Sequence, residues 1–153
     1  MPKLNLAQIE FKTGSSYPEP YASEMGDRGR YPLGDAAGLT QFGANLMVMQ
    51  PGSKSSLRHW HKNEDEFVMV TQGELVLVQD EGEIRMRRGE FAAFKAGDTN
   101  GHHLINLSDQ EARFLVIGTK ISSDVCTYPD VDMKVVIEGD TDKFMRIDGT
   151  DLD

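Results

Sequence analysis

The sequence predicts an all-β protein that folds as a single antiparallel β-barrel or sandwich. Turn signals recur about every 8–10 residues through the central part of the chain, and the short segments between them are rich in strand-forming residues. No long stretch between these turns has the period of an amphipathic helix. Glycine accounts for 15 of the 153 residues, above the typical share of about 7%, and the excess lies mostly at the predicted turns. A chain of this length is expected to form one domain around one core.

The central strands are predicted in order at 46–49, 57–61, 66–72, 74–79, 83–87, 91–95, 102–107 and 113–119. Pro51-Gly52 ends the first of them, and Gly73 provides the hinge of a tight turn between the third and fourth. After Lys120 the pattern weakens. Residues 126–132 are interpreted as a loop with a strand start, followed by strands at 133–138 and 143–147.

The predicted domain organisation has three parts. Residues 1–44 carry little regular pattern because their prolines and glycines interrupt any long element, so they are expected to form an N-terminal arm that packs on the barrel. Residues 45–147 form the barrel itself. Residues 148–153 are acidic and are expected to form a frayed tail.

The composition limits the possible partners and locations. A net charge of −9 argues against nucleic acid or an anionic membrane as a partner, and it mildly disfavours an anionic substrate. No apolar run approaches the length of a transmembrane helix, and the first 13 residues lack the pattern of a secretory signal. The single cysteine, Cys126, cannot form an internal disulfide and is interpreted as a buried thiol. Together these features predict a cytoplasmic protein.

Two groups of arginines are candidates for binding an anionic ligand. Arg28 and Arg30, with Tyr31, form the concentrated cationic and aromatic patch of the arm. This patch is either a solvated loop or a substrate-facing arm, and the sequence leaves both open. Arg85 and Arg87 share one face of their predicted strand, so they cannot serve if that face is the outer one.

All four histidines lie in two tight clusters. His59 and His61 are two residues apart, which in a strand places both imidazoles on one face. Glu66 begins the next apolar run, and either His102 or His103 can complete the set after a later hairpin. Three imidazoles and one carboxylate on neighbouring strands suit Fe, Mn, Ni, Cu or Zn.

These residues resemble the two sequence motifs of the cupin superfamily. The first motif reads Gly, five residues, His-x-His, three or four residues, Glu, six residues, Gly; this chain has Gly52, His59-Trp60-His61, Glu66 and Gly73, with one extra residue in the first gap. The second motif reads Gly, five residues, Pro-x-Gly, two residues, His, three residues, Asn; this chain has Gly89, Lys95 in place of Pro, Gly97, His102 and Asn106, with a loop two residues longer. The resemblance covers residues 46–118.

The resemblance implies a cupin-type β-barrel, also described as a jelly roll or double-stranded β-helix. It implies one divalent metal ion (Zn, Fe, Mn or Ni) held by His59, His61, Glu66 and His102. The spacing to Asn106 selects His102 as the fourth ligand, with His103 as the alternative. Small cupin barrels commonly pair, so a homodimer is expected.

Two classes of function follow from the resemblance. The first is a metal-dependent enzyme that acts on a small polar molecule as an isomerase, lyase or oxygenase. The chain is most similar to small single-domain bacterial cupins described as sugar-phosphate isomerases, which is an analogy only. The second is a non-catalytic cupin that binds or stores a small molecule. The sequence assigns no catalytic acid or base.

Overall fold

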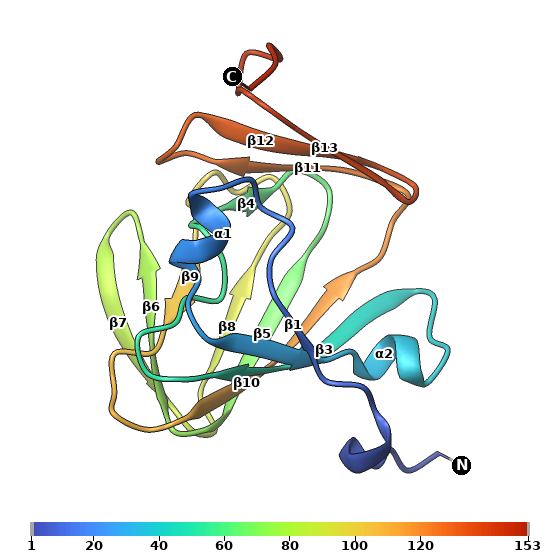
Figure 1. The fold of residues 1–153 in the computed structure, drawn as a ribbon, viewed down its shortest axis with the longest axis vertical. Helices are drawn as coiled ribbons and strands as arrows, with labels where there is room; N and C mark the ends of the chain where they lie inside the picture. Colours follow the sequence, from blue (N-terminus) through green and yellow to red (C-terminus); the bar gives the residue numbers. More distant parts are fainter. Residues whose placement is uncertain (1, 153) are drawn as a thin grey trace.

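Strands make up most of the regular structure in the computed structural model, which describes residues 2–152 (Figure 1). Met1 and Asp153, the outer ends of the predicted arm and tail, lie outside the described residues. The strands form three antiparallel sheets of six, four and three strands. Isolated bridges between His59 and His102 and between Lys54 and Ile105 supplement these sheets, which do not close into one continuous ladder. The predicted all-β jelly roll is therefore confirmed as an open sandwich of antiparallel sheets.

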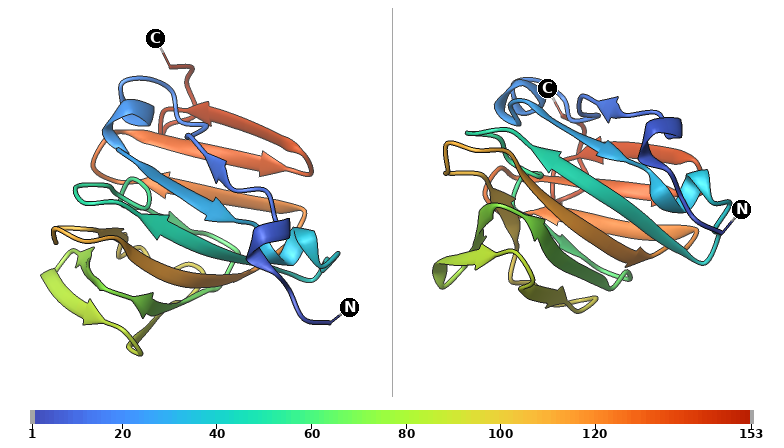
Figure 2. Two further views of the ribbon diagram at one scale, coloured as in Figure 1. Left: turned by 60° about the horizontal axis from the view of Figure 1, so that its bottom comes forward. Right: turned by 90° about the horizontal axis from the view of Figure 1, so that it is seen from below.

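The six-stranded sheet forms one wall of the sandwich, and Figure 2 shows β2, β3 and β10 side by side within it. Its order is β1 (Lys12–Thr13), β2 (Arg28–Tyr31), β3 (Phe42–Met49), β10 (Ala112–Thr119), β5 (Glu66–Gln72) and β8 (Phe91–Phe94). Met47 lies opposite Phe114, and Phe114 lies opposite Val70. Directly opposed residues share a face, so these three buried side chains line the inner side of the sheet.

The two smaller sheets complete the sandwich. The four-stranded sheet has the order β13 (Thr141–Met145), β12 (Met133–Glu138), β11 (Ser123–Tyr128) and β4 (Trp60–His61). The three-stranded sheet has the order β7 (Gly82–Arg87), β6 (Glu74–Gln79) and β9 (His103–Ile105). In Figure 1 the strands β11 to β13 lie along the top and β6, β7 and β9 lie to the left.

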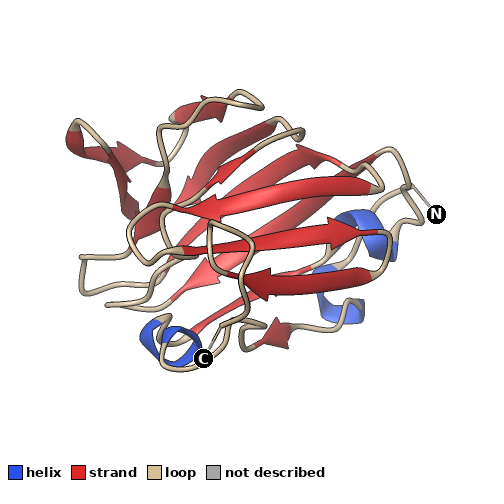
Figure 3. Cartoon of the chain, turned by 90° about the horizontal axis from the view of Figure 1, so that it is seen from above, coloured by secondary structure: helices blue, strands red, loops and turns tan. Residues whose placement is uncertain are grey.

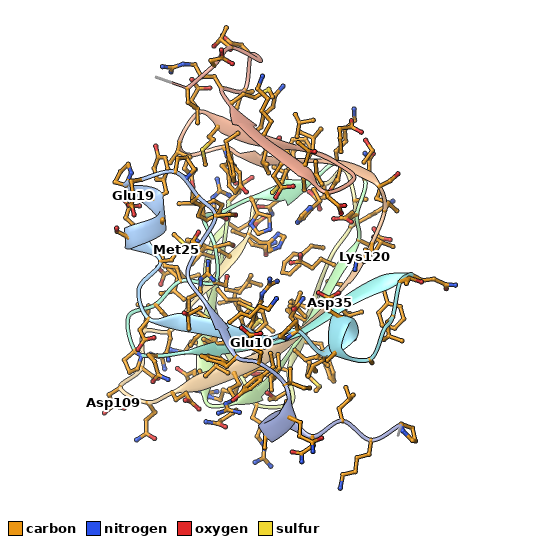
Figure 4. The ribbon with its side chains drawn as sticks, turned by 45° about the vertical axis from the view of Figure 1, so that its right-hand side comes forward. Glu10, Glu19, Met25, Asp35, Asp109 and Lys120 are labelled. Carbon is orange, nitrogen blue, oxygen red and sulfur yellow. The ribbon has the colours of Figure 1, made fainter. Side chains whose placement is uncertain are left out.

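Two apolar clusters fill the molecule. The larger one packs between the six-stranded and three-stranded sheets and includes Met49, Val70, Leu75, Leu104 and Phe114. The second lies under the four-stranded sheet and contains Met25, Leu57, Cys126, Tyr128, Met133 and Val135. Figure 4 shows Met25 next to the short helix of the arm, where it joins this second cluster.

The N-terminal arm carries short elements that its sequence pattern did not reveal. They are η1 (Leu6–Gln8), β1, α1 (Tyr21–Glu24), β2 and α2 (Leu33–Ala36), and the short helices lie at the outside of the molecule (Figure 3). Pro20 and Pro32 stand directly before α1 and α2. Proline is tolerated at the start of a helix, so these prolines interrupt longer elements without preventing short helices. Strands β1 and β2 extend the six-stranded sheet beyond β3. Lys120 Nζ donates to Asp35 Oδ1 over 3.2 Å, a contact that ties α2 to the end of β10 (Figure 4).

The predicted hairpin at Gly73 is confirmed: β5 and β6 have the predicted bounds, and Gly73 has a φ of +70°. The prediction of a loop at 126–132 is wrong in its first half, because residues 126–128 belong to β11. The buried positions of β11 are Asp124, Cys126 and Tyr128, so its alternation does not look hydrophobic in the sequence.

The C-terminal segment returns to the body of the protein. The amide of Arg146 donates to the carbonyl oxygen of Thr150 over 2.9 Å, and Leu152 packs against the second apolar cluster. Among the described residues, the helices are too short and too polar to cross a membrane.

Candidate metal centre

The two halves of the motif meet through the backbone of His59 and His102. The amide of His59 donates to the carbonyl oxygen of His102 over 3.1 Å, and the amide of His102 donates back to His59 over 2.9 Å. This pair of hydrogen bonds brings the two imidazoles to a centroid distance of 4.6 Å. Both side chains are buried.

His61 and Glu66 complete the cluster. The rings of His59 and His61 lie 5.0 Å apart and almost perpendicular, with His59 in an isolated bridge directly before β4 and His61 in β4. The Glu66 carboxylate reaches two imidazoles, with Oε1 3.0 Å from His102 Nε2 and Oε2 3.6 Å from His61 Nε2. The structure thus brings together all four residues that the motifs select. Ligand atoms of His59, Glu66 and His102 lie within 4.8 Å of one another.

Glu66 points inward because of the alternation of β5. Val68 and Val70, on the same face, are 1% and 0% exposed, whereas Phe67 on the other face is 43% exposed. The neighbouring acid Asp65 has a different role, since its Oδ1 accepts a hydrogen bond from the amide of Ala96 over 2.8 Å. Glu66 thus lies in one potential metal-binding group with His59 and His102, whereas Glu64 lies in another with His61 and Asp124.

The outer nitrogens of two imidazoles are held by acceptors of the protein. His59 Nδ1 donates to the carbonyl oxygen of Leu57 over 2.8 Å, and His61 Nδ1 lies 2.8 Å from Asp124 Oδ2. An acceptor at Nδ1 fixes the proton there and leaves Nε2 with a free lone pair. Asp124 is itself buried and also accepts from the amide of Asn63 over 2.8 Å.

His102 is positioned differently. Its ring stacks on Phe94 with centroids 3.5 Å apart and planes within 2° of parallel. Its Nδ1 is buried and has no hydrogen-bond partner among the described residues, while Nε2 contacts Glu66. Packing against Phe94 and the Glu66 carboxylate therefore set the orientation of this ring.

The protonation states suit a metal ligand set. Burial, together with the nearby His102, lowers the pKa of His59 to about 3, so its imidazole is neutral at physiological pH. Burial alone would raise the pKa of Glu66, but the hydrogen bond with His102 and the adjacent His59 lower it to about 2. A neutral imidazole and an ionised carboxylate are the forms that bind divalent ions, so the donor set fits the predicted group.

The other histidine of the second cluster faces elsewhere. His103 Nδ1 contacts the carbonyl oxygen of Ser56 at 2.9 Å, and His103 belongs to none of the potential metal-binding groups of the described chain. His102, rather than His103, therefore lies in the cluster with His59 and Glu66.

Strand β11 places two residues beside the candidate metal centre that the sequence analysis did not assign to it. Asp124 supports His61, and the Cys126 sulfur lies within 4.8 Å of ligand nitrogens of His59 and His61. Burial raises the pKa of Cys126 to about 12, which keeps it a neutral thiol and a poor nucleophile. The alternation of Asp124, Cys126 and Tyr128 is the signal that could have revealed this strand.

A cavity of about 750 Å³ opens beside the cluster. His59, His61 and Cys126 line one end of it, and Tyr17 and Arg28 of the arm line another part. This volume is typical of pockets that hold small molecules. The cluster therefore lies where a bound small molecule can reach it.

An open jelly roll with two histidine-bearing motifs around an inward-facing glutamate is the arrangement found in cupins, and comparisons with known proteins identify the family. Residues 45–118 match the cupin domain family. The chain is 50% identical to a crystal structure described as a sugar phosphate isomerase of the cupin superfamily from Silicibacter pomeroyi, over 99% of this chain and 97% of that one, with a TM-score of 0.97. This chain belongs to the cupin superfamily.

Two further structures show how far the similarity extends. A candidate sugar phosphate isomerase from Acidithiobacillus ferrooxidans is 26% identical over 82% of this chain and 80% of its own, with a TM-score of 0.75. A predicted oxalate decarboxylase from Thermotoga maritima is 18% identical over 78% of this chain and 99% of its own, with a TM-score of 0.62, and shares the fold alone. A search of curated proteins finds no match.

Proposed function

We propose that this protein is a metal-dependent enzyme that acts on a small polar molecule, with His59, His61, Glu66 and His102 as the ligands of one divalent ion. The observation that carries the proposal is the position of the Glu66 carboxylate, 3.0 Å from His102 Nε2 and 3.6 Å from His61 Nε2. An ionised carboxylate shared between imidazoles in a buried cluster supplies the mixed nitrogen and oxygen donors that Zn, Fe, Mn and Ni accept. When bound, such an ion supplies a Lewis acid that polarises an oxygen of the substrate.

The residues of the chain prepare the site for this role. Leu57 and Asp124 hold the outer nitrogens of His59 and His61, which orients both rings before a ligand arrives. Tyr17 and Tyr128 line the cavity, and burial raises the pKa of both hydroxyls, so each remains a neutral hydrogen-bonding group. Leu57, Cys126 and Tyr128, which lie beside the histidines, belong to the second apolar cluster.

We propose sugar-phosphate isomerisation as the first reaction to test. Its support is the description of the Silicibacter pomeroyi protein, which is 50% identical over nearly the whole chain. A non-catalytic binding role is the outcome that a metal-loaded protein without turnover would establish.

The experiment uses two adjacent histidines as a matched pair. We expect His102→Gln to reduce the metal content of protein purified without added metal by about tenfold or more, because it removes a ligand. His103→Gln should retain the wild-type content, because His103 contacts Ser56 instead. Elemental analysis measures the metal, and an isomerase assay with sugar phosphates follows on the same samples. Equal metal content in the two variants would contradict the assignment of the ligands.

We also propose that the protein works as a homodimer in the cytoplasm, with a small molecule rather than nucleic acid or a membrane as its partner. The single cysteine is a free, buried thiol, which suits a reducing compartment. Phe67 and Phe91 lie side by side on the outer face of the six-stranded sheet, with ring centroids 5.8 Å apart and planes tilted by 38°, although they are 43% and 60% exposed. An exposed aromatic pair next to the edge strand β8 is a surface that a second subunit can cover.

A further inference from the structure

One wall of the cavity carries three cationic side chains: Lys12 from β1 and Arg28 and Arg30 from β2. We call these three residues the cationic wall. Among the described residues, none of the three forms an ion pair. Asp142 also lines the cavity, but its side chain is exposed on β13 and lies beyond ion-pair distance of all three.

The strand register directs these side chains inward. Arg28 lies opposite Met49 and Arg30 lies opposite Met47, while Lys12 lies opposite Arg30. Opposed residues of antiparallel strands share a face, and Met47 and Met49 belong to the apolar core. The cationic wall therefore continues the inner face of the sheet past the point where its apolar side chains end.

Arg28 is the innermost cation by its environment. Its guanidinium is half-buried, and Nη1 donates to the carbonyl oxygen of Gly14 over 3.3 Å. Its Nε is buried and has no partner in the described chain. Burying part of a charged group without a counter-charge is costly, and no carboxylate of residues 2–152 lies within ion-pair distance of Arg28 to offset that cost. An anion in the cavity would accept a charge-assisted hydrogen bond at this nitrogen.

The rest of the cavity has a different character. The four-stranded sheet contributes an apolar wall of Val135, Ile137 and Phe144. Hydroxyl groups of the arm, among them those of Ser15 and Ser16, lie along its polar side. The cavity therefore offers cations, hydroxyls and imidazoles to a single small molecule, although the net charge of the whole chain is −9. The total charge of the chain does not decide whether the cavity prefers an anion or a cation, because an exposed charge is screened beyond about 8 Å at physiological salt.

We propose that the cationic wall binds an anionic group, a phosphate monoester or a carboxylate, of the small molecule whose other end reaches His59 and His61. Arg28 makes the direct contact, and Arg30 and Lys12 attract the anion at the rim. The contact of the small molecule with His59 and His61 rests on the proposed function, whereas the anion site itself requires no metal.

The test is calorimetric titration with three matched probes: ribose 5-phosphate, the carboxylate gluconate and neutral ribose. Wild-type protein is used both metal-loaded and metal-free. We expect Arg28→Gln to weaken binding of the anion by about tenfold or more. A tenfold loss of affinity corresponds to about 1.4 kcal/mol of binding free energy. Binding of ribose should not change, and Arg28→Lys should restore part of the affinity. Arg88→Gln, which removes an equal charge from the exposed surface, should bind like the wild type.

The outcomes separate this inference from the proposed function. Anion binding that Arg28→Gln and Arg30→Gln leave unchanged would overturn the cationic wall, whatever the metal content. An equal loss in Arg88→Gln would also overturn it, because the effect would then be one of total charge. The wild type could bind ribose 5-phosphate or gluconate through Arg28 and yet never take up metal. That result would contradict only the proposed function. If circular dichroism shows that Arg28→Gln does not fold, Arg30→Gln replaces it in the test, because Arg30 is exposed. We then expect Arg30→Gln to lower the affinity for the anion.

Discussion

At the scale of single residues, the buried carboxylate of Asp124 is tolerated because it meets specific hydrogen-bond partners. Asp124 is 1% exposed, yet it contacts His61 Nδ1 and the amide of Asn63, both at 2.8 Å. A buried carboxylate without such contacts would be strongly destabilising. The same contacts orient His61 within the candidate metal centre, so one residue serves both stability and the site.

Tyr17 gives a prediction about alkaline pH. Burial raises its pKa from 10.0 to about 12, whereas the unfolded chain releases the proton near the lower value. Between pH 10 and 12 the unfolded state therefore binds fewer protons than the folded state, and the free energy of unfolding falls as the pH rises. We expect Tyr17→Phe to lose less stability than the wild type over this window, as measured by urea unfolding.

Tyr31→Phe is the control for this measurement, since Tyr31 also belongs to the arm and packs against Phe11. Burial also raises the pKa of Cys126 from 9.0 to about 12, so its ionisation likewise lowers the free energy of unfolding as the pH rises. Both variants retain this contribution. Parallel curves for wild type and Tyr17→Phe would show that Tyr17 ionises normally in the folded protein.

At the scale of elements, the edge formed by β1 and β2 depends on close packing. Gly29 of β2 has no room for a side chain, because an added Cβ would collide with the ring of Phe11 and lie 2.8 Å from the carbonyl oxygen of Lys12. Since β1 and β2 together carry the cationic wall, this packing also shapes the cavity.

Gly29→Ala should therefore displace β1 and lower the free energy of unfolding by about 1–3 kcal/mol. Hydrogen exchange should show faster exchange of the amides paired between β1 and β2, with little change in β5 and β6. Gly43→Ala is the matched control, because Gly43 also lies in a strand of this sheet and an added Cβ there would approach no atom closer than 3.9 Å. Equal destabilisation by the two substitutions would argue against a packing role for Gly29.

At the scale of the whole molecule, the exposed pair Phe67 and Phe91 gives a prediction about assembly. We expect the wild type to have twice the monomer mass in light scattering at micromolar concentration. Phe91→Glu should shift it to the monomer, because a charge would be buried against the second subunit. Ile84→Glu is the control, since Ile84 is 58% exposed on β7, in the separate three-stranded sheet. A wild type that is monomeric, or a dimer that Phe91→Glu leaves intact, would rule out this surface.

Local pattern was sufficient to predict β5, β6 and the hairpin between them, whereas the strand predicted at 57–61 is shortened to β4 at Trp60–His61. The alternation of Glu66, Val68 and Val70 and the turn at Gly73 are set by neighbours a few residues apart, and the structure has them as predicted. The spacing of His59 and His61 likewise predicted that their rings share a face.

Tertiary structure alone decided which distant residues support the site. Asp124 lies 63 positions from His61, and it reaches that ring only because β11 pairs with β4 in one register. The orientation of Arg28 toward the cavity likewise follows from its register with Met49, which no periodicity in a four-residue strand could reveal. The sequence determined where the central strands β5 to β8 and the motif residues lie, because those depend on local alternation. The partners of each site residue depend instead on pairing between strands far apart in the chain.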